Sequence, residues 1–154
     1  MDAYTCSVDV ADSKLVASPC LCNSLRQASR AVSRLYDEEL RSVGLRTTQY
    51  SLLRYLKHSG PVRQRDFGAS TSLDETTLTR NLRPLIQAGW VAVDAGADRR
   101  EKLIRLTKSG LAKLARAGPA WERAQDRLRT RLPKPAWSSL LEMLPDLTRL
   151  ADEM

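Results

Sequence analysis

The chain has 154 residues, a length that suits one domain with a hydrophobic core of its own. Lysine and arginine exceed aspartate and glutamate by 25 to 18, a formal net charge of +7, and this surplus favours a polyanionic partner. The three cysteines lie near the N-terminus and do not form a secreted disulfide framework, no apolar run could span a membrane, and the N-terminus lacks the layout of a signal peptide. We therefore expect a cytoplasmic protein without a membrane partner.

The first part of the chain is predicted to be helical. Apolar residues at helical spacing predict a long helix over about Pro19 to Val43, and Gly44 is placed to end it. A second helix is predicted to begin at Thr47 and to end before Gly60. A short third helix, around Arg63–Gly68, precedes a turn.

The next segment predicts a fourth helix with two different faces. Asp74 is expected to cap its N-terminus, and Gly89 to end it in a left-handed turn. Its apolar residues recur at helical spacing: Leu78, Leu82, Leu85 and Ile86. Its polar face is expected to meet DNA through Thr76, Thr77, Thr79, Arg80 and Arg83. Threonine offers a hydroxyl and a methyl group to base edges, and arginine binds phosphates or guanine.

Two short strands follow this helix. Trp90–Val93 and Leu103–Leu106 alternate apolar with other residues, and a highly charged turn separates them. A helix followed by such a hairpin is typical of a winged helix-turn-helix, in which the helix enters a major groove and the wing reaches the neighbouring phosphates or minor groove. The alternative is a solvated helix face and an ordinary charged turn.

The C-terminal part predicts two further helices. The first begins at Lys108, and Gly118-Pro119 is expected to bend or interrupt it. Pro133 and Pro135 separate it from a last, leucine-rich helix. The apolar stripes of the flanking helices favour packing on a symmetry mate, which would present two recognition helices to two half-sites. An intramolecular helical layer is the alternative.

These elements define the predicted organisation. The fold class is mainly α with a small β-hairpin wing, a winged helix-turn-helix core and long N- and C-terminal dimerisation helices. Residues 1–18 are expected to be a flexible arm, residues 46–107 the DNA-binding domain, and residues 19–45 and 108–154 the helical dimerisation region.

Together, the motifs resemble the MarR family of bacterial transcription regulators over roughly residues 20–152. The specific part is Asp98-Arg99-Arg100 followed by Leu106-Thr107-Lys108-Ser109-Gly110 at this spacing. The resemblance implies a homodimer that binds a pseudo-palindromic operator, usually as a repressor. It also implies that Arg100 reaches the minor groove, that Asp98 holds Arg100 in place, and that Arg99 serves phosphates.

The resemblance extends in part to the organic-hydroperoxide-sensing branch of this family. Cys22, at the start of the first helix, and Tyr36 stand at similar spacings, and in that branch the matching cysteine is oxidised. The sequence departs from the branch where Arg26 and Thr47 replace two tyrosines. Two further thiols could resolve an oxidised Cys22: Cys6 and Cys20. Cysteine oxidation is therefore one candidate release signal, and a small buried cysteine is the alternative.

A second candidate signal is a small ligand. Arg26, together with Tyr36 and with Tyr50 or Trp90, could bind an aromatic carboxylate through a bidentate pair. The alternative is a surface arginine or a salt bridge at a dimer interface.

Other classes have less support. There is no glycine-rich phosphate loop or paired-carboxylate motif, and His58 has no evident nucleophile partner, so we expect no enzyme and no cofactor. One histidine and a Cys-x-Cys pair do not make a metal site. A sequence-independent DNA-packaging protein remains a rival, because basic charge alone would satisfy it.

Overall fold

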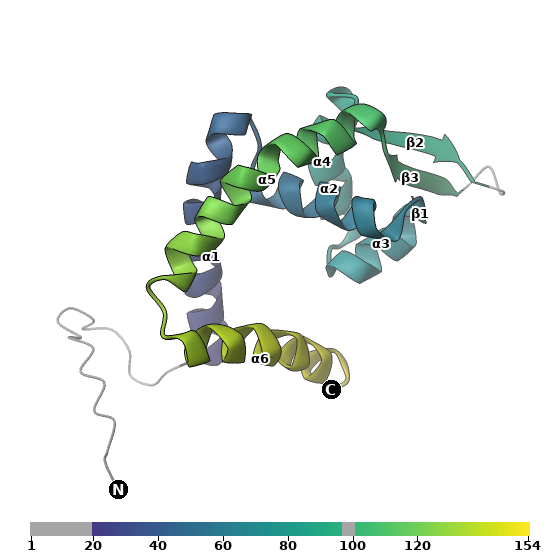
Figure 1. Cartoon of the computed structure of the whole chain (residues 1–154). Helices are drawn as coiled ribbons and strands as arrows, with labels where there is room; N and C mark the ends of the chain where they lie inside the picture. The colour runs from purple at the N-terminus through teal and green to yellow at the C-terminus, as the bar shows by residue number, and fades with distance from the viewer. Residues whose placement is uncertain (1–19, 97–100) are drawn as a thin grey trace, which may run out of the picture. The chain divides into compact units, whose positions relative to one another are not determined.

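The computed structural model of the protein describes residues 20–96 and 101–154. The chain divides into two units, Met1–Val32 and Ser33–Met154, and each is described by itself. In chain order the elements are α1 (Leu21–Leu40), the 3-10 helix η1 (Arg41–Val43), α2 (Thr47–Ser59), β1 (Val62–Arg63), α3 (Gln64–Thr71), α4 (Glu75–Gln87), β2 (Val91–Ala95), β3 (Lys102–Leu106), α5 (Lys108–Arg129) and α6 (Lys134–Asp152) (Figure 1).

The strands form one small antiparallel sheet in the order β1-β3-β2. β2 and β3 make the expected hairpin, in which Val93 pairs with Ile104. β1 adds a third strand, with Val62 opposite Ile104 and Arg63 opposite Leu103. The predicted fold class, mainly α with a winged helix-turn-helix, is confirmed. The strand β1 was not predicted, because two residues are too few to show an alternating pattern. It joins α3 directly to the wing.

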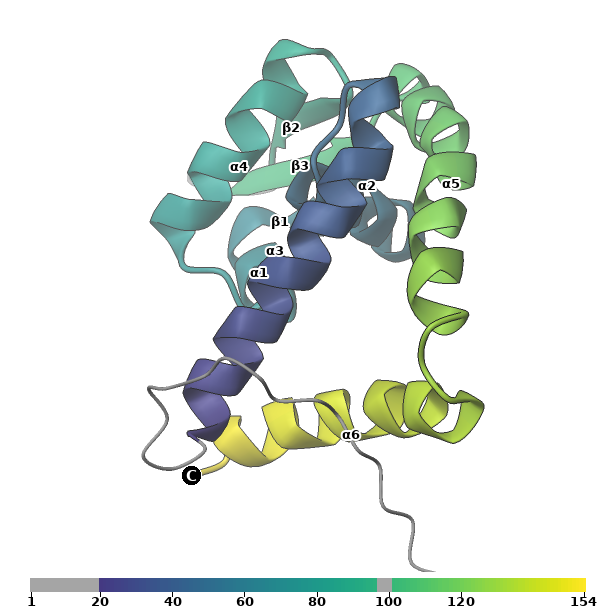
Figure 2. The same ribbon diagram turned by 90° about the vertical axis from the view of Figure 1, so that its left-hand side faces the viewer.

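The core of the second unit lies where α2, α4 and α5 meet the sheet. Figure 2 shows α2 between α4 and α5, and residues of α2 contact both of these helices. Each buried aliphatic or aromatic side chain contributes roughly 1.5–3 kcal/mol relative to an exposed one. The largest fully buried side chains are Leu40, Leu53, Leu56, Phe67, Leu78, Leu82, Leu85, Val91 and Ile104.

The N-terminus of α2 is capped by a side chain from α1. The carboxylate oxygen Oδ1 of Asp37 accepts hydrogen bonds from the backbone N–H and the hydroxyl of Thr47, both at 2.6 Å. The side-chain oxygen of Gln49 accepts from the backbone N–H of Arg46 at 2.9 Å. These bonds satisfy free N–H groups at the helix start and tie the end of α1 to α2.

The start of α5 is clamped to the turn that follows α4. The Thr107 hydroxyl oxygen accepts from the Gly110 N–H at 3.0 Å, which caps α5, and donates to the Gly89 carbonyl at 2.7 Å. The Ser109 hydroxyl donates to the same Gly89 carbonyl at 2.7 Å, and the Thr107 N–H donates to the Trp90 carbonyl at 3.0 Å. Gly89 has a φ of 70°, in the left-handed region, as its predicted role at the helix end requires. The motif at residues 107–110 is therefore a close backbone junction.

Of the two outcomes expected at Gly118-Pro119, an interruption does not occur, because the helix runs without a break from Lys108 to Arg129. Proline lacks the N–H that would bond to the carbonyl four residues earlier, which here belongs to Ala115. Ala115 and Pro119 are both exposed, so water can satisfy that carbonyl. Ala117 and Ala120, on the opposite side, are fully buried and hold the helix against the core.

Two smaller expectations about the helix-turn-helix are also corrected. α3 continues to Thr71 instead of ending at Gly68, and the turn is made by Ser72, whose φ is 51°. Ile86, one of the four apolar residues whose spacing predicts the buried face of α4, is 40% exposed. Leu78, Leu82 and Leu85 already occupy the buried stripe, and Ile86 lies at its edge.

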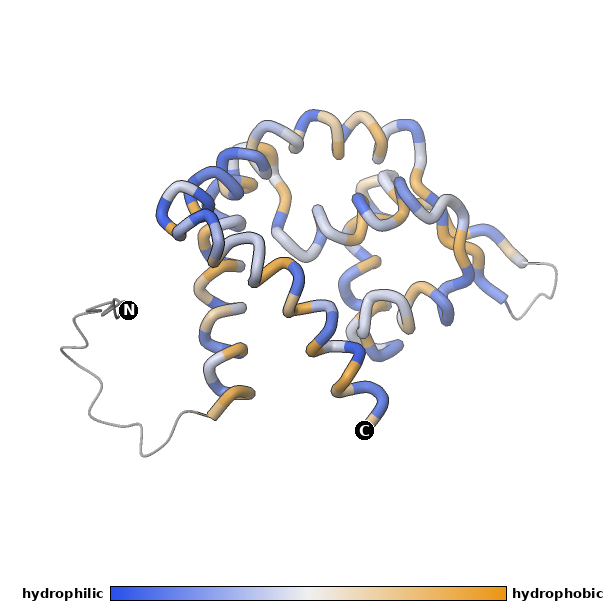
Figure 3. Tube along the Cα trace, turned by 60° about the horizontal axis from the view of Figure 1, so that its bottom comes forward, coloured by the Kyte–Doolittle hydropathy of each residue, from blue (hydrophilic) through white to orange (hydrophobic). Residues whose placement is uncertain are grey.

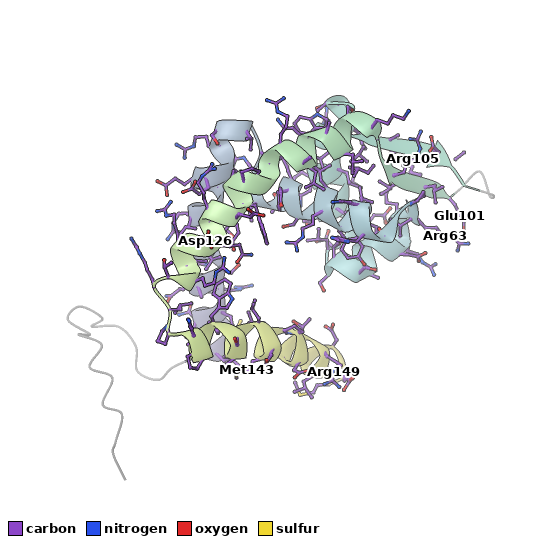
Figure 4. The ribbon with its side chains drawn as sticks, viewed as in Figure 1. Arg63, Glu101, Arg105, Asp126, Met143 and Arg149 are labelled. Atoms are coloured by element: carbon purple, nitrogen blue, oxygen red, sulfur yellow. The ribbon has the colours of Figure 1, made fainter. Side chains whose placement is uncertain are left out.

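α6 has no buried residue. Most of its large apolar side chains are exposed, among them Leu140 at 45%, Leu141 at 57%, Met143 at 65% and Leu144 at 43%. Apolar and polar residues alternate along α6 in Figure 3, and Figure 4 labels Met143 on this helix. Within residues 20–96 and 101–154, no helix is both long and apolar enough to cross a membrane. α6 is thus an amphipathic helix whose apolar face is left open in the single chain.

The junction at Gly110 makes a stability prediction. A Cβ atom there would collide with the carbonyl oxygen of Trp90 and lie 2.8 Å from the Leu106 side chain, so the backbone of α5 or of the Trp90 turn must move. We expect Gly110→Ala to lower the free energy of unfolding by about 2 kcal/mol, as overpacking does. Urea unfolding at one fixed protein concentration measures it.

The matched control is Gly118→Ala in the same helix. No atom lies within 4 Å of a Cβ added at Gly118, so this change should raise stability slightly through helix propensity. Equal effects of the two substitutions would show that the Gly110 junction is not the constraint inferred here.

Candidate functional site

α4 presents a polar face because its leucines face the core. Leu78 and Leu82 are 1% and 2% exposed, and Leu85 is fully buried. The opposite side of the helix carries four of the five residues predicted to contact DNA, all exposed: Thr76, Thr79, Arg80 and Arg83. This exposed face combines two hydroxyls with two positive charges on one rigid element.

Asp74 caps the N-terminus of α4, as the sequence predicts. Its carboxylate accepts from the Thr77 backbone N–H at 2.9 Å and from the Thr77 hydroxyl at 2.7 Å. The hydrogen bond from the Thr77 side chain, followed by that from its backbone, holds the pKa of the Asp74 carboxyl below its usual value. Thr77, the fifth predicted DNA contact, is half-buried and gives its hydroxyl proton to the cap. Its side chain therefore serves the helix start.

The base of the wing is closed by backbone and ionic contacts. The Gly96 N–H donates to the Glu101 carbonyl at 2.8 Å, and a Cβ at Gly96 would lie 2.7 Å from that of Glu101. Arg63 of β1 pairs with Glu101 at 3.5 Å, and Figure 4 shows both beside the end of the hairpin. Across the hairpin, Arg105 pairs with Asp94 at 2.6 Å. The wing base is thus fixed from both sides.

The predicted wing-tip residues lie outside the described residues: Asp98, Arg99 and Arg100. Their roles stay predictions.

A group of aromatic and cationic side chains lies between α1, α2 and α5. Tyr36 and Tyr50 are buried, and burial raises the pKa of both phenols while the nearby Arg54 guanidinium acts in the opposite direction. Trp121 stacks on Tyr50 with ring centroids 6.0 Å apart, and the Arg54 guanidinium carbon lies 4.4 Å from the Trp121 ring centroid. The positive charge of Arg54 thus acts on both tyrosines that the sequence predicts to be near a ligand.

The predicted sensing residues of the first unit lie on or next to α1. Cys20 and Cys22 are exposed free thiols, and Cys6 lies outside the described residues. Arg26 is exposed and lines a shallow hollow of about 410 Å³ with Leu25, Ser29 and Arg30. The structure describes this unit by itself, so the predicted grouping of Arg26 with Tyr36 and Tyr50 stays a prediction.

Sequence reasoning missed Arg54 and Gln64. Arg54 follows Tyr50 by one helical turn on α2, so helical spacing could have found it. Gln64, at the first residue of α3, donates from Nε2 to the Thr79 hydroxyl oxygen at 3.2 Å, and no spacing along the chain signals a contact between two helices. Among the described residues, no three histidine, cysteine or carboxylate side chains are grouped as metal ligands would be.

Comparisons with known proteins agree with this architecture. A family model described as MarR family matches residues 43–101. An HTH-type transcriptional regulator of Bacillus subtilis, YwoH, itself uncharacterised, is 34% identical over 88 residues, which are 57% of this chain. The chain covers 64% of the length of that relative.

Solved structures extend the likeness to most of the chain. The Mycobacterium tuberculosis transcriptional regulator MosR in complex with DNA is 33% identical, with a TM-score of 0.79, and the match covers 88% of this chain and 98% of MosR. The transcriptional repressor CouR, bound to a DNA duplex, is 26% identical with a TM-score of 0.77, over 84% of this chain and 92% of CouR.

These matches and the winged helix-turn-helix geometry point to the same family. The chain belongs to the MarR family, whose members are transcriptional regulators and not enzymes.

Proposed function

We propose that this chain is a homodimeric, sequence-specific DNA-binding repressor that acts in the cytoplasm on a pseudo-palindromic operator. The observation that carries the proposal is the two-faced α4, whose leucines are buried while Thr76, Thr79, Arg80 and Arg83 are exposed. α4 would enter the major groove, where the threonines read base edges and the arginines bind phosphates or guanine. The wing tip, with Asp98, Arg99 and Arg100, would reach the adjacent groove and phosphates. MosR and CouR, both solved with DNA, support this reading.

A second copy of the chain is the proposed partner of α6. The exposed leucines on this helix make an apolar face that a single chain leaves open to water. A two-fold axis would cover the same face on both copies and would set two α4 helices against two half-sites. The flanking helical regions, residues 19–45 and 108–154, would form this dimerisation region.

The rival function is a sequence-independent DNA-packaging protein, which the net charge of +7 alone would support. The exposed threonines of α4 favour sequence-specific binding, because they bring no positive charge but can read base edges. A large ratio of specific to non-specific affinity would exclude the rival.

Release from DNA has two candidate signals. The first is oxidation of Cys22, with Cys20 as a resolving thiol, and the exposure of both thiols to solvent supports it. The second is an aromatic carboxylate with no redox role, bound near Tyr36 and Tyr50 by Arg26 or by Arg54. The position of Arg54 beside both phenols and over Trp121 supports the second signal.

DNA binding is tested by Arg80→Ala. Removing one arginine from the face of α4 should weaken binding to the duplex upstream of the protein's own gene by about 1–3 kcal/mol, as measured by fluorescence anisotropy at one salt concentration. The control is Arg116→Ala, which removes the same charge from an exposed position on α5. If the two variants lose the same affinity, only the total charge matters and the packaging protein is favoured.

The dimer is tested by Leu141→Glu. A carboxylate on the apolar face of α6 should weaken association by about 2 kcal/mol or more, because a charge is costly to bury without a partner. Light scattering on a sizing column should show two chains for the wild type and a shift toward one for the variant. Glu142→Gln, at an exposed neighbouring position, is the control and should stay dimeric. A wild type of one chain would contradict the dimer.

The release signal is tested on the same duplex with reduced protein, hydroperoxide-treated protein and treated Cys22→Ser. If the thiol is the switch, oxidant should weaken wild-type binding by about tenfold or more, dithiothreitol should restore it, and Cys22→Ser should stay bound. If all three bind alike, cysteine oxidation is not the signal. Benzoate titrations of wild type, Arg26→Ala and Arg54→Ala then test the carboxylate alternative.

A further inference from the structure

One side-chain hydrogen bond crosses between the two helices of the helix-turn-helix. Gln64, the first residue of α3, donates from its side-chain amide to the Thr79 hydroxyl oxygen on α4 at 3.2 Å. In the part of the chain that the structure describes, it is the only bond between a side chain of α3 and a side chain of α4. Elsewhere between these helices, the Leu78 side chain approaches Gly68. The bond therefore links the polar face of α4 to a residue outside it.

The backbone of Gln64 is held on both sides. The residue before it, Arg63, pairs with Leu103 of β3, and Phe67, three residues later, is fully buried in the core. The Gln64 side chain is half-buried and lines a hollow of about 640 Å³ with residues of α4 and of the wing base, including Leu78 and Lys102. The backbone position from which the Gln64 side chain reaches Thr79 is therefore fixed, and the bond itself lies at the solvent-exposed surface.

The direction of this bond decides what Thr79 can offer to DNA. A threonine hydroxyl carries one proton and two acceptor sites. At Thr79 the Gln64 amide occupies one of the two acceptor sites, so the proton points away from Gln64 and is free to be donated outward, beside one remaining acceptor site. At Thr77 the arrangement is reversed, because Asp74 takes the hydroxyl proton. Thr79 therefore suits the acceptor atoms of a base edge: N7 or O6 of guanine, N7 of adenine, or O4 of thymine.

We propose that Gln64 is a positioning residue for sequence readout, which holds the Thr79 hydroxyl as a hydrogen-bond donor and so sets the base preference at one position of each half-site. This inference rests on the proposed function, since it requires α4 to lie in a major groove. It deepens that function by assigning part of the specificity to a residue on α3. Gln64 acts through Thr79 and needs no base contact of its own.

The test compares full-length wild type, Gln64→Ala, Thr79→Val and the double variant. Each protein selects duplexes from a randomised library, and anisotropy then measures its affinity for the wild-type consensus duplex and for every single-base change in it, at one salt concentration. For the wild type, changing the base read by Thr79 should weaken binding about tenfold, within the range of a single mismatch. Thr79→Val and Gln64→Ala should both reduce this discrimination to less than about threefold, at the same position and at no other.

The double variant separates coupling from two independent effects. Because Gln64 acts through Thr79, adding Gln64→Ala to Thr79→Val should cause no further loss of discrimination. Gln87→Ala is the matched control, because Gln87 is an exposed glutamine on α4 and should leave every base preference unchanged. Thermal unfolding of each variant separates a loss of readout from a loss of fold.

Gln64→Glu gives a second, opposite test. A carboxylate can only accept, so it should take the Thr79 proton and leave the hydroxyl as an acceptor. The preference at that position should then move toward a base edge that presents an amino group, adenine N6 or cytosine N4.

Three results would overturn the proposal. They are an unchanged preference in Gln64→Ala, an equal loss at all positions, and an unchanged preference in Gln64→Glu. A wild type that enriches no sequence would instead overturn the proposed function, and this inference with it.

Discussion

The rest of the second unit depends on how closely α5 approaches the turn after α4. At Gly110 no side chain fits, because the carbonyl of Trp90 occupies the space that a Cβ would need. Thr107 and Ser109 donate hydrogen bonds to the backbone carbonyls of Gly89 and Trp90 at this junction. The end of α4, the start of β2 and the start of α5 meet there. The orientation of α4, and with it that of its exposed face, is thus set by the contact at its C-terminal end and by its buried leucines.

Two surfaces of the second unit expose groups that a binding partner could cover or bind. α4 leaves hydrogen-bonding groups and positive charge exposed on a rigid helix, whereas α6 leaves large apolar side chains exposed. The first surface suits a polyanion, and the second suits an apolar partner. The proposed function needs both kinds of surface, because a protein that binds DNA as a symmetric pair offers one surface to the DNA and the other to its partner.

Much of this fold could be predicted from local signals. Asp74 as a cap, Gly44 and Gly89 as left-handed helix ends, and the leucine spacing of α4 were all correct, since each depends on neighbouring residues alone. The continuity of α5 through Pro119 and the strand β1 could not be predicted in this way, because they depend on burial and on pairing with distant segments.

The candidate site divides in the same way. The exposed residues of α4 followed from helical spacing, but the engagement of Thr77 by its cap had to be seen in three dimensions. The bond from Gln64 to Thr79 and the ring contact of Arg54 with Trp121 each join two different elements. Spacing along the chain does not predict such contacts.

The unbroken course of α5 has a mechanical consequence. This helix joins the aromatic cluster at Trp121 to the junction at Gly110 as one continuous element, with 11 residues from one to the other, or about 17 Å of helix at about 1.5 Å per residue. Over that length, a tilt of about 5° displaces one end by roughly 1.5 Å relative to the other. The carbonyl of Trp90 already occupies the space beside Gly110, so a displacement of α5 toward it would also move the turn that follows α4. No break at Pro119 separates the two places, so the position of one is coupled to that of the other.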